Sequence, residues 1–206
     1  MASATISRPR LGRSQTGTMT ADAETNAVVK EEAMEEAFLF ADEFGPYKLI
    51  ETYRPAVGLK AVVAVDNIAC GPAIDGVRIA PDVSAEEAFR LARAMTFKNA
   101  AAGLPHGGGK SVIVADPKMP LREKERLIRA FAAAIADLTE YIPGPDMGTD
   151  ELAMGWVKDE TRRAVGLPRE IGGIPLDEIG ATGLVSSARS TWRDSKSGCR
   201  SKMRVS

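Results

Sequence analysis

The sequence is poor in the residues that build disulfide frameworks and metal centres, and it has no long apolar run. Its two cysteines, Cys70 and Cys199, lie far apart, so we expect no disulfide framework, no metal site and a reducing, cytoplasmic compartment. His106 is the single histidine, which excludes the zinc motif HExxH and other sites that need two histidines. No apolar stretch approaches the ~18 residues of a membrane span, so we expect no membrane partner.

Neither sign of charge is in excess. The chain has 27 basic and 28 acidic residues among 206, with a formal net charge of −1. This balance gives no long-range field that would attract nucleic acid, so we expect no nucleic-acid partner. With 44% apolar residues, the composition is that of an ordinary globular protein with a sizeable core. Any partner must therefore be recognised at a local site.

The two ends of the chain differ in composition from the middle. Residues 1–20 contain three arginines, several serines and threonines and no acid, which is typical of organelle transit peptides and of disordered leaders. We expect residues 1–29 to be a disordered leader. The last 18 residues contain six basic residues, one acid and five serines without periodicity. We expect residues 184–206 to form a basic, disordered tail, with a tail that contacts nucleic acid as the alternative.

Between the ends, helical and strand patterns alternate, which predicts an α/β fold. Residues 59–68 and 111–117 are β-branched apolar runs and are predicted as strands. Residues 142–148 are predicted to form a rigid turn. Helices are predicted at residues 31–47, 83–103, 120–141 and 150–165. The third has one apolar face, formed by Ile128, Phe131, Ile135 and Leu138, and Thr149 is expected to cap the fourth.

The helix predicted at residues 83–103 has the clearest boundaries. Ser84 is a candidate N-cap, Glu87 completes a capping box, and Gly103 supplies a left-handed stop. The apolar stripe of this helix consists of Ala88, Leu91, Ala92 and Met95. Continuing the series by three residues from Met95 reaches Lys98, so we expect that lysine on the inward side of the helix.

The segment GLPHGGGKS, residues 103–111, has the composition of a phosphate-binding loop but not its spacing. A P-loop would need glycine at position 104, where the chain has Leu104. It would also need to lead from a strand into a helix, whereas this segment leads from a helix into a strand. A glycine-rich turn can instead bring the backbone close to a small ligand and present Lys110 at the start of a buried strand.

Lys98 and Lys110 flank the same glycine-rich turn. Mutual repulsion and partial burial would favour the neutral form of one amine, which could then act as a base near pH 7. The other, still charged, is suited to hold a carboxylate.

Four segments together resemble one known family: GPAIDGVR, RLARAMTFKNAAAGLPHGGGKSVI, PGPDMGTDELAMGW and GLPREIGGIPLDEIGATG. In this order and spacing they are similar to the glutamate/leucine/phenylalanine/valine dehydrogenases over roughly residues 35–183. The resemblance implies that residues 30–183 form the N-terminal substrate-binding and oligomerisation domain, a mixed sheet flanked by helices. It also implies a homo-oligomer.

The resemblance implies reversible NAD(P)-dependent oxidative deamination of an L-amino acid to a 2-oxo acid and ammonia. By matching positions, Lys98 binds the substrate α-carboxylate, Lys110 is catalytic, and Asp146 is its proton-transfer partner. From the residues alone, Asp146 would be a turn former. The remaining substrate-binding positions implied by the match are Ile74, Gly76, Gly108 and Gly109.

The preferred amino acid is left open by the sequence. Glutamate-specific members have a lysine in GPxKGG that binds the side-chain carboxylate, and this chain has Ile74 there. An apolar residue at that place resembles the leucine, valine and phenylalanine branch, because it cannot pair a charge. Asp75, however, replaces a customary glycine, and GTDELAMGW resembles the glutamate branch. An aliphatic amino acid is the preferred alternative.

The coenzyme domain of the family is not recognisable in this sequence. No GxGxxG motif occurs, and the 23 residues after Gly183 (206 − 183) are fewer than the roughly 30 of one βαβ unit. Thr182 is implied to lie near the nicotinamide, and the choice between NAD and NADP stays open. We therefore expect a truncated or frameshifted chain that is inactive alone. The alternative is a non-catalytic, stand-alone substrate-binding and oligomerisation domain.

Overall fold

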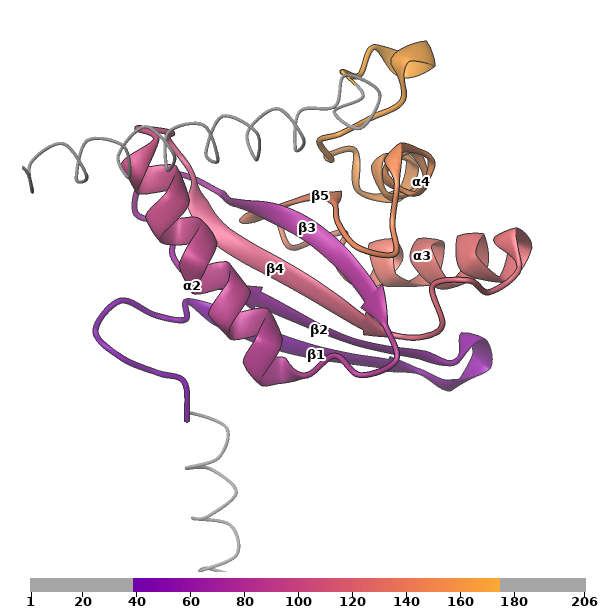
Figure 1. The fold of residues 1–206 in the computed structure, drawn as a ribbon, viewed down its shortest axis with the longest axis horizontal. Coiled ribbons are helices and arrows are strands. Elements are labelled where there is room, and N and C mark those ends of the chain that lie inside the picture. The colour runs from indigo at the N-terminus through magenta and orange to yellow at the C-terminus, as the bar shows by residue number, and fades with distance from the viewer. Residues whose placement is uncertain (1–38, 175–206) are drawn as a thin grey trace, which may run out of the picture. The chain divides into compact units, whose positions relative to one another are not determined.

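The computed structural model describes residues 39–174, of which Asp42 onward belong to one compact unit. This unit is built on a five-stranded sheet with the strand order β1-β2-β4-β3-β5 (Figure 1). The strands are β1 (Lys48–Arg54), β2 (Leu59–Val65), β3 (Ala73–Ala80), β4 (Gly107–Val114) and β5 (Tyr141–Pro145). β2 is antiparallel to both β1 and β4, whereas β3 is parallel to β4 and β5. The predicted α/β fold with a mixed sheet is confirmed.

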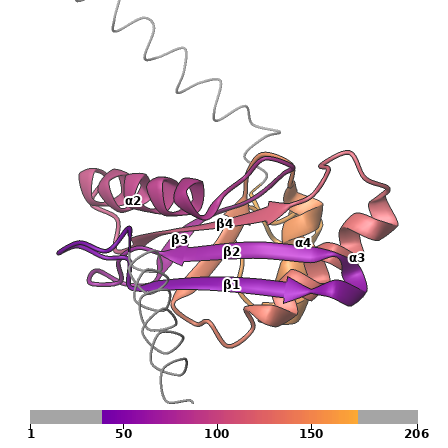
Figure 2. The same cartoon turned by 90° about the horizontal axis from the view of Figure 1, so that it is seen from below.

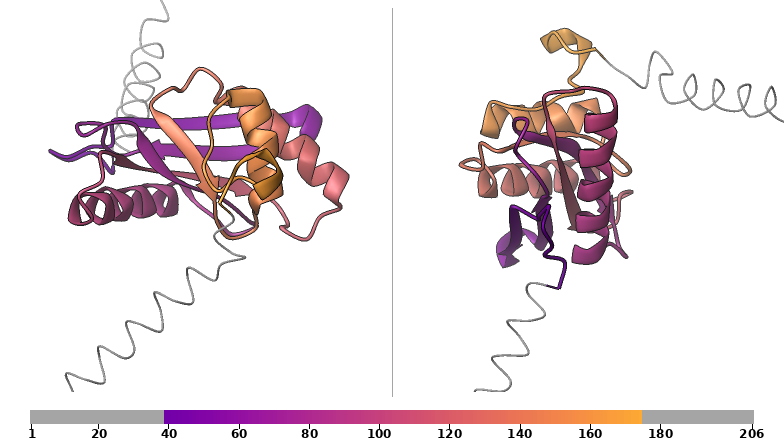
Figure 3. Two further views of the ribbon diagram at one scale, coloured as in Figure 1. Left: turned by 90° about the horizontal axis from the view of Figure 1, so that it is seen from above. Right: turned by 90° about the vertical axis from the view of Figure 1, so that its left-hand side faces the viewer.

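Three helices cover the two faces of the sheet. α2 (Ala85–Ala101) packs on β4 and β2, whereas α3 (Leu121–Ala134) and α4 (Glu151–Thr161) lie together on the opposite face. Figure 2 shows α2 along one side of the sheet, and the right-hand view of Figure 3 shows the sheet between α2 and the other two helices. Two short 3-10 turns, η1 (Pro55–Val57) and η2 (Arg169–Ile171), complete the described elements.

The two faces of the sheet bury cores of different size. The larger core joins alternate residues of β2 to α3 and α4 and includes Leu59, Val63, Phe131, Tyr141 and Met154, all of them fully buried. The smaller core, under α2, consists of Ala64, Ala88, Ala92 and Val112. Because three of its four members are alanine, α2 can approach β4 closely, which brings helix and strand backbones into contact near the site described below.

The helix predicted at residues 83–103 is confirmed. Ser84 is its N-cap, with Oγ accepting a hydrogen bond of 3.2 Å from the Glu87 backbone N–H. Gly103 follows the helix in the left-handed region, with φ of +66°. The side chain of Glu87 pairs with Arg78 on the neighbouring strand.

Other predicted boundaries are wrong. α3 ends at Ala134. The carbonyl groups that follow it, those of Ile135, Ala136 and Leu138, accept hydrogen bonds from the Arg163 guanidinium in place of a further helical turn. The four apolar residues predicted for one face of that helix are nonetheless buried.

Asp150, and not Thr149, caps α4, with its carboxylate accepting from the Ala153 N–H at 2.9 Å. The predicted turn at residues 142–148 is in its first half the strand β5. Two prolines are tolerated there because β5 is an edge strand.

Three strands were absent from the sequence prediction: β1, β3 and β5, the last of which was predicted as a turn. The helix predicted at residues 31–47 lies partly outside the described residues, and its described part, residues 39–47, consists of turns, a bend and isolated bridges. The predicted leader at residues 1–29 and the predicted tail at 184–206 also lie outside the described residues.

Candidate active site

Lys110 lies in the middle of β4, on the face that α2 covers. Lys110 is only 3% exposed, so its amine is buried in the protein, and the residue belongs to a strand and not to a loop. The expectation of a lysine at the start of a buried strand is corrected in one respect, since the strand begins three residues earlier, at Gly107.

The three glycines before Lys110 are strand residues that other groups approach closely. A Cβ on Gly107 would lie 1.5 Å from the carbonyl oxygen of Asn67, and one on Gly108 would lie 2.0 Å from that of Ala92 in α2. A Cβ on Gly109 would lie 2.7 Å from the ring of Tyr141. The predicted glycine-rich turn is therefore wrong in its position. In the structure the run allows backbones and a ring to pack on β4.

Asp146 directly follows β5 and forms the shortest ion pair with Lys110. Its Oδ2 lies 2.6 Å from the Lys110 Nζ. The backbone of Asp146 is fixed by Thr149, whose Oγ accepts from the Asp146 N–H at 2.9 Å and donates to the Val77 carbonyl at 2.7 Å. A Cβ on Gly76 would lie 2.4 Å from the Asp146 Cβ. Glycine is therefore required at position 76 for the Asp146 side chain to occupy its place beside Lys110.

Five charged side chains form an alternating series that we call the ion-pair chain: Glu87, Arg78, Asp146, Lys110 and Asp75. Arg78 of β3 pairs with Glu87 of α2 and donates from Nε to the Asp146 Oδ2 at 3.0 Å. Lys110 donates to the Asp75 Oδ2 at 3.0 Å. The series therefore joins α2, β3, β4 and the end of β5 through ionic contacts.

Electrostatics of the ion-pair chain favour the charged form of its central carboxylate. Burial opposes ionisation of Asp146, but hydrogen bonds from Lys110 and Arg78 outweigh it and hold its pKa below the usual value. Burial also opposes the charge on Arg78, yet its bonds to Asp146 and Glu87 raise its pKa. At neutral pH, Asp146 is thus a carboxylate that can accept a proton.

The expected neighbour of the Lys110 amine is corrected by this geometry. The sequence predicted repulsion from a second lysine, but the groups beside the Lys110 amine are the carboxylates of Asp75 and Asp146. Both carboxylates lie within hydrogen-bonding distance of the amine.

The expectation that Lys98 points inward is wrong. Lys98 is exposed, and the next residue, Asn99, is 3% exposed and donates from Nδ2 to the Gly107 carbonyl at 2.9 Å. The buried stripe of α2 runs through Ala88 and Ala92 to Asn99, so a step of seven residues from Ala92 gives the inward position. Within residues 39–174, no ion pair involves Lys98.

Two further residues were predicted for the site, Ile74 and Thr182. Ile74, half-buried in β3, is in register with Gly108 of β4. Thr182 lies outside the described residues.

Arg78 had no predicted role, and Glu87 was predicted only as part of a helix capping box. The sequence does single out Arg78, because it is a charged residue within an otherwise apolar run and lies two positions after Gly76.

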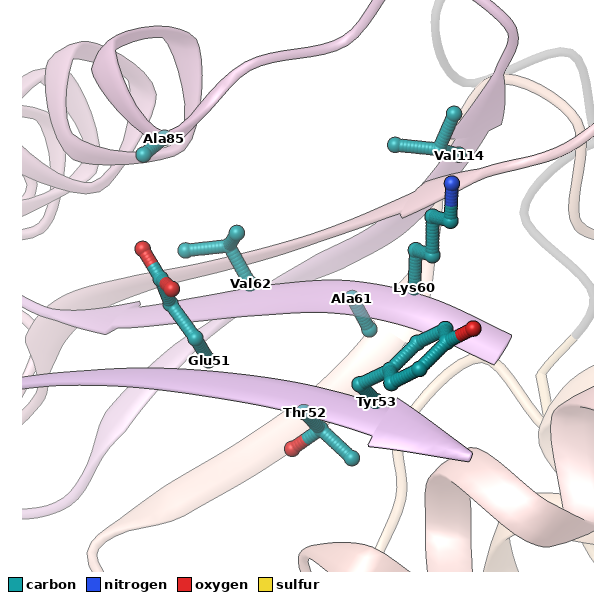
Figure 4. Close-up of a pocket in the computed structure, with 8 residues that line it drawn as sticks. All are labelled: Glu51, Thr52, Tyr53, Lys60, Ala61, Val62, Ala85 and Val114. Carbon is teal, nitrogen blue, oxygen red and sulfur yellow. The ribbon is translucent and has the colours of Figure 1, made fainter. Parts of the chain in front are cut away.

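A shallow pocket of about 590 Å³ lies elsewhere on the sheet and includes no member of the ion-pair chain. Figure 4 shows it between Tyr53 and Glu51 of β1, Lys60 and Val62 of β2 and the first residue of α2. Over residues 39–174, no three acidic, histidine or cysteine side chains are grouped to hold a metal ion. In the same part of the chain, no helix is long and apolar enough to span a bilayer.

Known proteins resemble this chain over the same region. A family model described as Glu/Leu/Phe/Val dehydrogenase, dimerisation domain, matches residues 50–163. Leucine dehydrogenase of Bacillus subtilis (strain 168) is 37% identical over 142 residues, which cover 66% of this chain and 38% of that protein. Valine dehydrogenase of Streptomyces virginiae is 38% identical over 164 residues, which cover 75% and 45%.

A solved structure shares the fold as well. The crystal structure of hetero-hexameric glutamate dehydrogenase from Thermus thermophilus, in a leucine-bound form, has a TM-score of 0.65 and 29% sequence identity. The match covers 89% of this chain and 50% of that one. The chain thus spans half or less of the length of each of these proteins. Since the family model matches more than half of the 206 residues, the chain belongs to the Glu/Leu/Phe/Val dehydrogenase family and corresponds to its N-terminal dimerisation domain.

Proposed function

We propose that this chain supplies the substrate-binding and oligomerisation part of an amino-acid dehydrogenase. The reaction would be the reversible oxidative deamination of an L-amino acid to a 2-oxo acid and ammonia. The observation that carries the proposal is the buried pair of Lys110 and Asp146, whose Nζ and Oδ2 lie 2.6 Å apart. An amine and a carboxylate in direct contact can each exchange a proton with a ligand bound beside the pair.

Lys110 and Asp146 would divide the proton transfers of the reaction. Held between two carboxylates, the Lys110 amine would pass a proton to an oxygen on the substrate α-carbon. Asp146 is ionised and can take up a proton from the departing or arriving amine. Arg78 would act as a positioning residue, because its bond to Asp146 orients the carboxylate.

Lys98 would hold the substrate α-carboxylate. Its amine is exposed on α2, and within residues 39–174 no carboxylate is paired with it, so its charge is available to a ligand. Gly108 and Gly109, whose Cβ positions are occupied by α2 and Tyr141, would contribute only backbone atoms to substrate binding, and Gly76 would keep Asp146 in place. Ile74 would contact the substrate side chain, which favours an aliphatic amino acid. The names of the relatives leucine dehydrogenase and valine dehydrogenase support the same preference.

The described residues do not fit a nicotinamide dinucleotide. Such a coenzyme is bound where a strand leads through a glycine-rich turn into a helix, with the pyrophosphate at the helix N-terminus. The glycine run of this chain instead lies within β4, and its glycines are covered by Asn67, α2 and Tyr141. These residues therefore supply no place for a hydride step, and binding of NAD or NADP would depend on other parts of the protein.

A second candidate function is a non-catalytic, stand-alone substrate-binding and oligomerisation domain. It is favoured by the poor fit of the described residues to a coenzyme. Under this alternative the chain binds the same ligands without turnover. Both alternatives include a homo-oligomer, which the family description as a dimerisation domain supports. Size-exclusion chromatography coupled to light scattering would measure the subunit number.

Calorimetric titration of the 206-residue chain with 4-methyl-2-oxopentanoate tests the proposed site. We expect saturable binding that is weakened about tenfold or more in Lys110→Met, because a buried charge contact is lost. Lys118→Met, which removes the same amine from an exposed position, is the matched control and should bind like the wild type. Equal binding by all three proteins would refute a ligand site at Lys110. Absorbance of NADH with ammonia and the oxo acid then separates the two candidate functions.

A further inference from the structure

The ion-pair chain carries one more negative than positive charge. Arg78 and Lys110 contribute two positive charges, whereas Glu87, Asp146 and Asp75 contribute three negative ones. Arg78 is already occupied by two carboxylates, and so is Lys110. Each end of the series is a carboxylate that pairs with one cation within residues 39–174, Glu87 with Arg78 and Asp75 with Lys110, so Asp75 places a negative charge beside the Lys110 amine that no second cation offsets.

Asp75 is held in this position by its backbone. The buried Tyr141 donates from its hydroxyl to the Asp75 carbonyl at 2.9 Å. The carboxylate itself is 3.0 Å from the Lys110 Nζ, and its side chain is 23% exposed, so it faces both the buried amine and solvent. Burial first, and then the negative charges of Asp75 and Asp146, raise the pKa of the Tyr141 hydroxyl. The field of Asp75 is therefore felt inside the protein.

We propose that Asp75 is a specificity-determining residue that disfavours substrates with a second carboxylate and directs the site towards 2-oxo acids with an uncharged side chain. This inference rests on the proposed function. A monocarboxylate needs one available cation, which Lys98 provides. A second carboxylate near Lys110 would face Asp75, and like charges that water screens poorly repel strongly. The neighbouring Ile74 offers no charge to compensate.

The experiment compares two oxo acids on the intact chain. Affinities for 4-methyl-2-oxopentanoate and for 2-oxoglutarate are measured by calorimetry with the wild type and Asp75→Asn. We expect the wild type to prefer the monocarboxylate by about tenfold or more, as like-charge contacts predict. In Asp75→Asn, binding of 2-oxoglutarate should strengthen relative to binding of the monocarboxylate, so that the preference falls at least about fivefold.

Asp82→Asn is the matched control, because it removes the same charge from an exposed position outside the ion-pair chain. It should leave the preference unchanged. Asp75→Gly provides the same loss of charge should the asparagine variant fail to fold, which circular dichroism would reveal. A preference that is unchanged by both Asp75 variants would overturn this inference and leave the proposed function standing. If the wild type binds neither oxo acid, both this inference and the proposed function are overturned.

Discussion

The Nζ of Lys110 and the Oδ2 of Asp146 lie 2.6 Å apart, although 35 residues (146 − 110 − 1) separate them in the sequence. The contact depends on two packing conditions. Gly76 leaves room for the Asp146 side chain, and the glycines of β4 allow α2 and Tyr141 to seal the strand that carries Lys110. Charge placement at this site is therefore a consequence of close backbone packing.

Replacement of Gly108 by alanine should destabilise the fold, since the new Cβ would lie 2.0 Å from the Ala92 carbonyl oxygen. Overpacking of this kind costs about 1–3 kcal/mol or more in free energy of unfolding. Gly155→Ala in α4 is the matched control, because its nearest neighbour is 3.9 Å away, and it should stabilise by about 0.5–1 kcal/mol. Urea unfolding of both variants measures these values, and equal effects would contradict the account of Gly108.

Arg163 should contribute more to stability than its surface neighbour Arg162. The Arg163 guanidinium donates to the carbonyls of Ile135, Leu138 and Tyr141, among others. A lysine cannot reproduce these bonds, so Arg163→Lys should lower the free energy of unfolding by about 2–4 kcal/mol. The same change at the exposed Arg162 should alter it by less than about 0.5 kcal/mol. Comparable losses in urea unfolding would show that the bonds of Arg163 are dispensable.

The N-cap of α4 gives a smaller effect. Asp150→Ala removes the carboxylate that accepts from the Ala153 N–H, and should cost about 1 kcal/mol. Asp150→Asn keeps a hydrogen-bond acceptor at the N-cap and should lower the free energy of unfolding by only a few tenths of a kcal/mol. Thermal unfolding by circular dichroism measures both. A loss of equal size in the two variants would contradict the capping role.

The stabilising effect of Asp146 should disappear in acid. Its pKa in the folded protein is lower than its unfolded value of ~3.9, so its contribution is fully present above about pH 4 and is lost as pH falls through the folded pKa. The difference in free energy of unfolding between the wild type and Asp146→Asn should therefore shrink on acidification below about pH 4. Urea unfolding between neutral and acidic pH measures it, and a difference independent of pH would contradict the ion-pair assignment.

Much of the fold follows from local patterns, and the errors have tertiary causes. Ser84 and Gly103 mark α2 because capping is a local property of the backbone. The end of α3 was missed because Arg163, a distant residue, satisfies the carbonyls beyond it. β3 was missed because it contains Gly76, a residue unfavourable in isolated strands that is needed here for the approach of Asp146.

The candidate site was predictable to a similar degree. Lys110 follows from its place after three glycines, and Asp146 from the family resemblance. The ion pair of Arg78 and Glu87 could not be predicted, because it forms only where the fold places α2 beside β3. Lys98 was misplaced because the stripe was extended from Leu91 and Met95, which are only half-buried, whereas the fully buried Ala92 leads seven residues on to Asn99, the residue that faces the sheet.

A double-mutant cycle on Lys110 and Asp146 tests the central claim most directly. The quantity measured is the affinity of the chain for 4-methyl-2-oxopentanoate in the wild type, Lys110→Met, Asp146→Asn and the double variant. If the two side chains act as one unit, the double variant should bind about as weakly as the weaker single variant, because the interaction is already lost. Losses that add in free energy would show that the two residues act independently and would contradict the account.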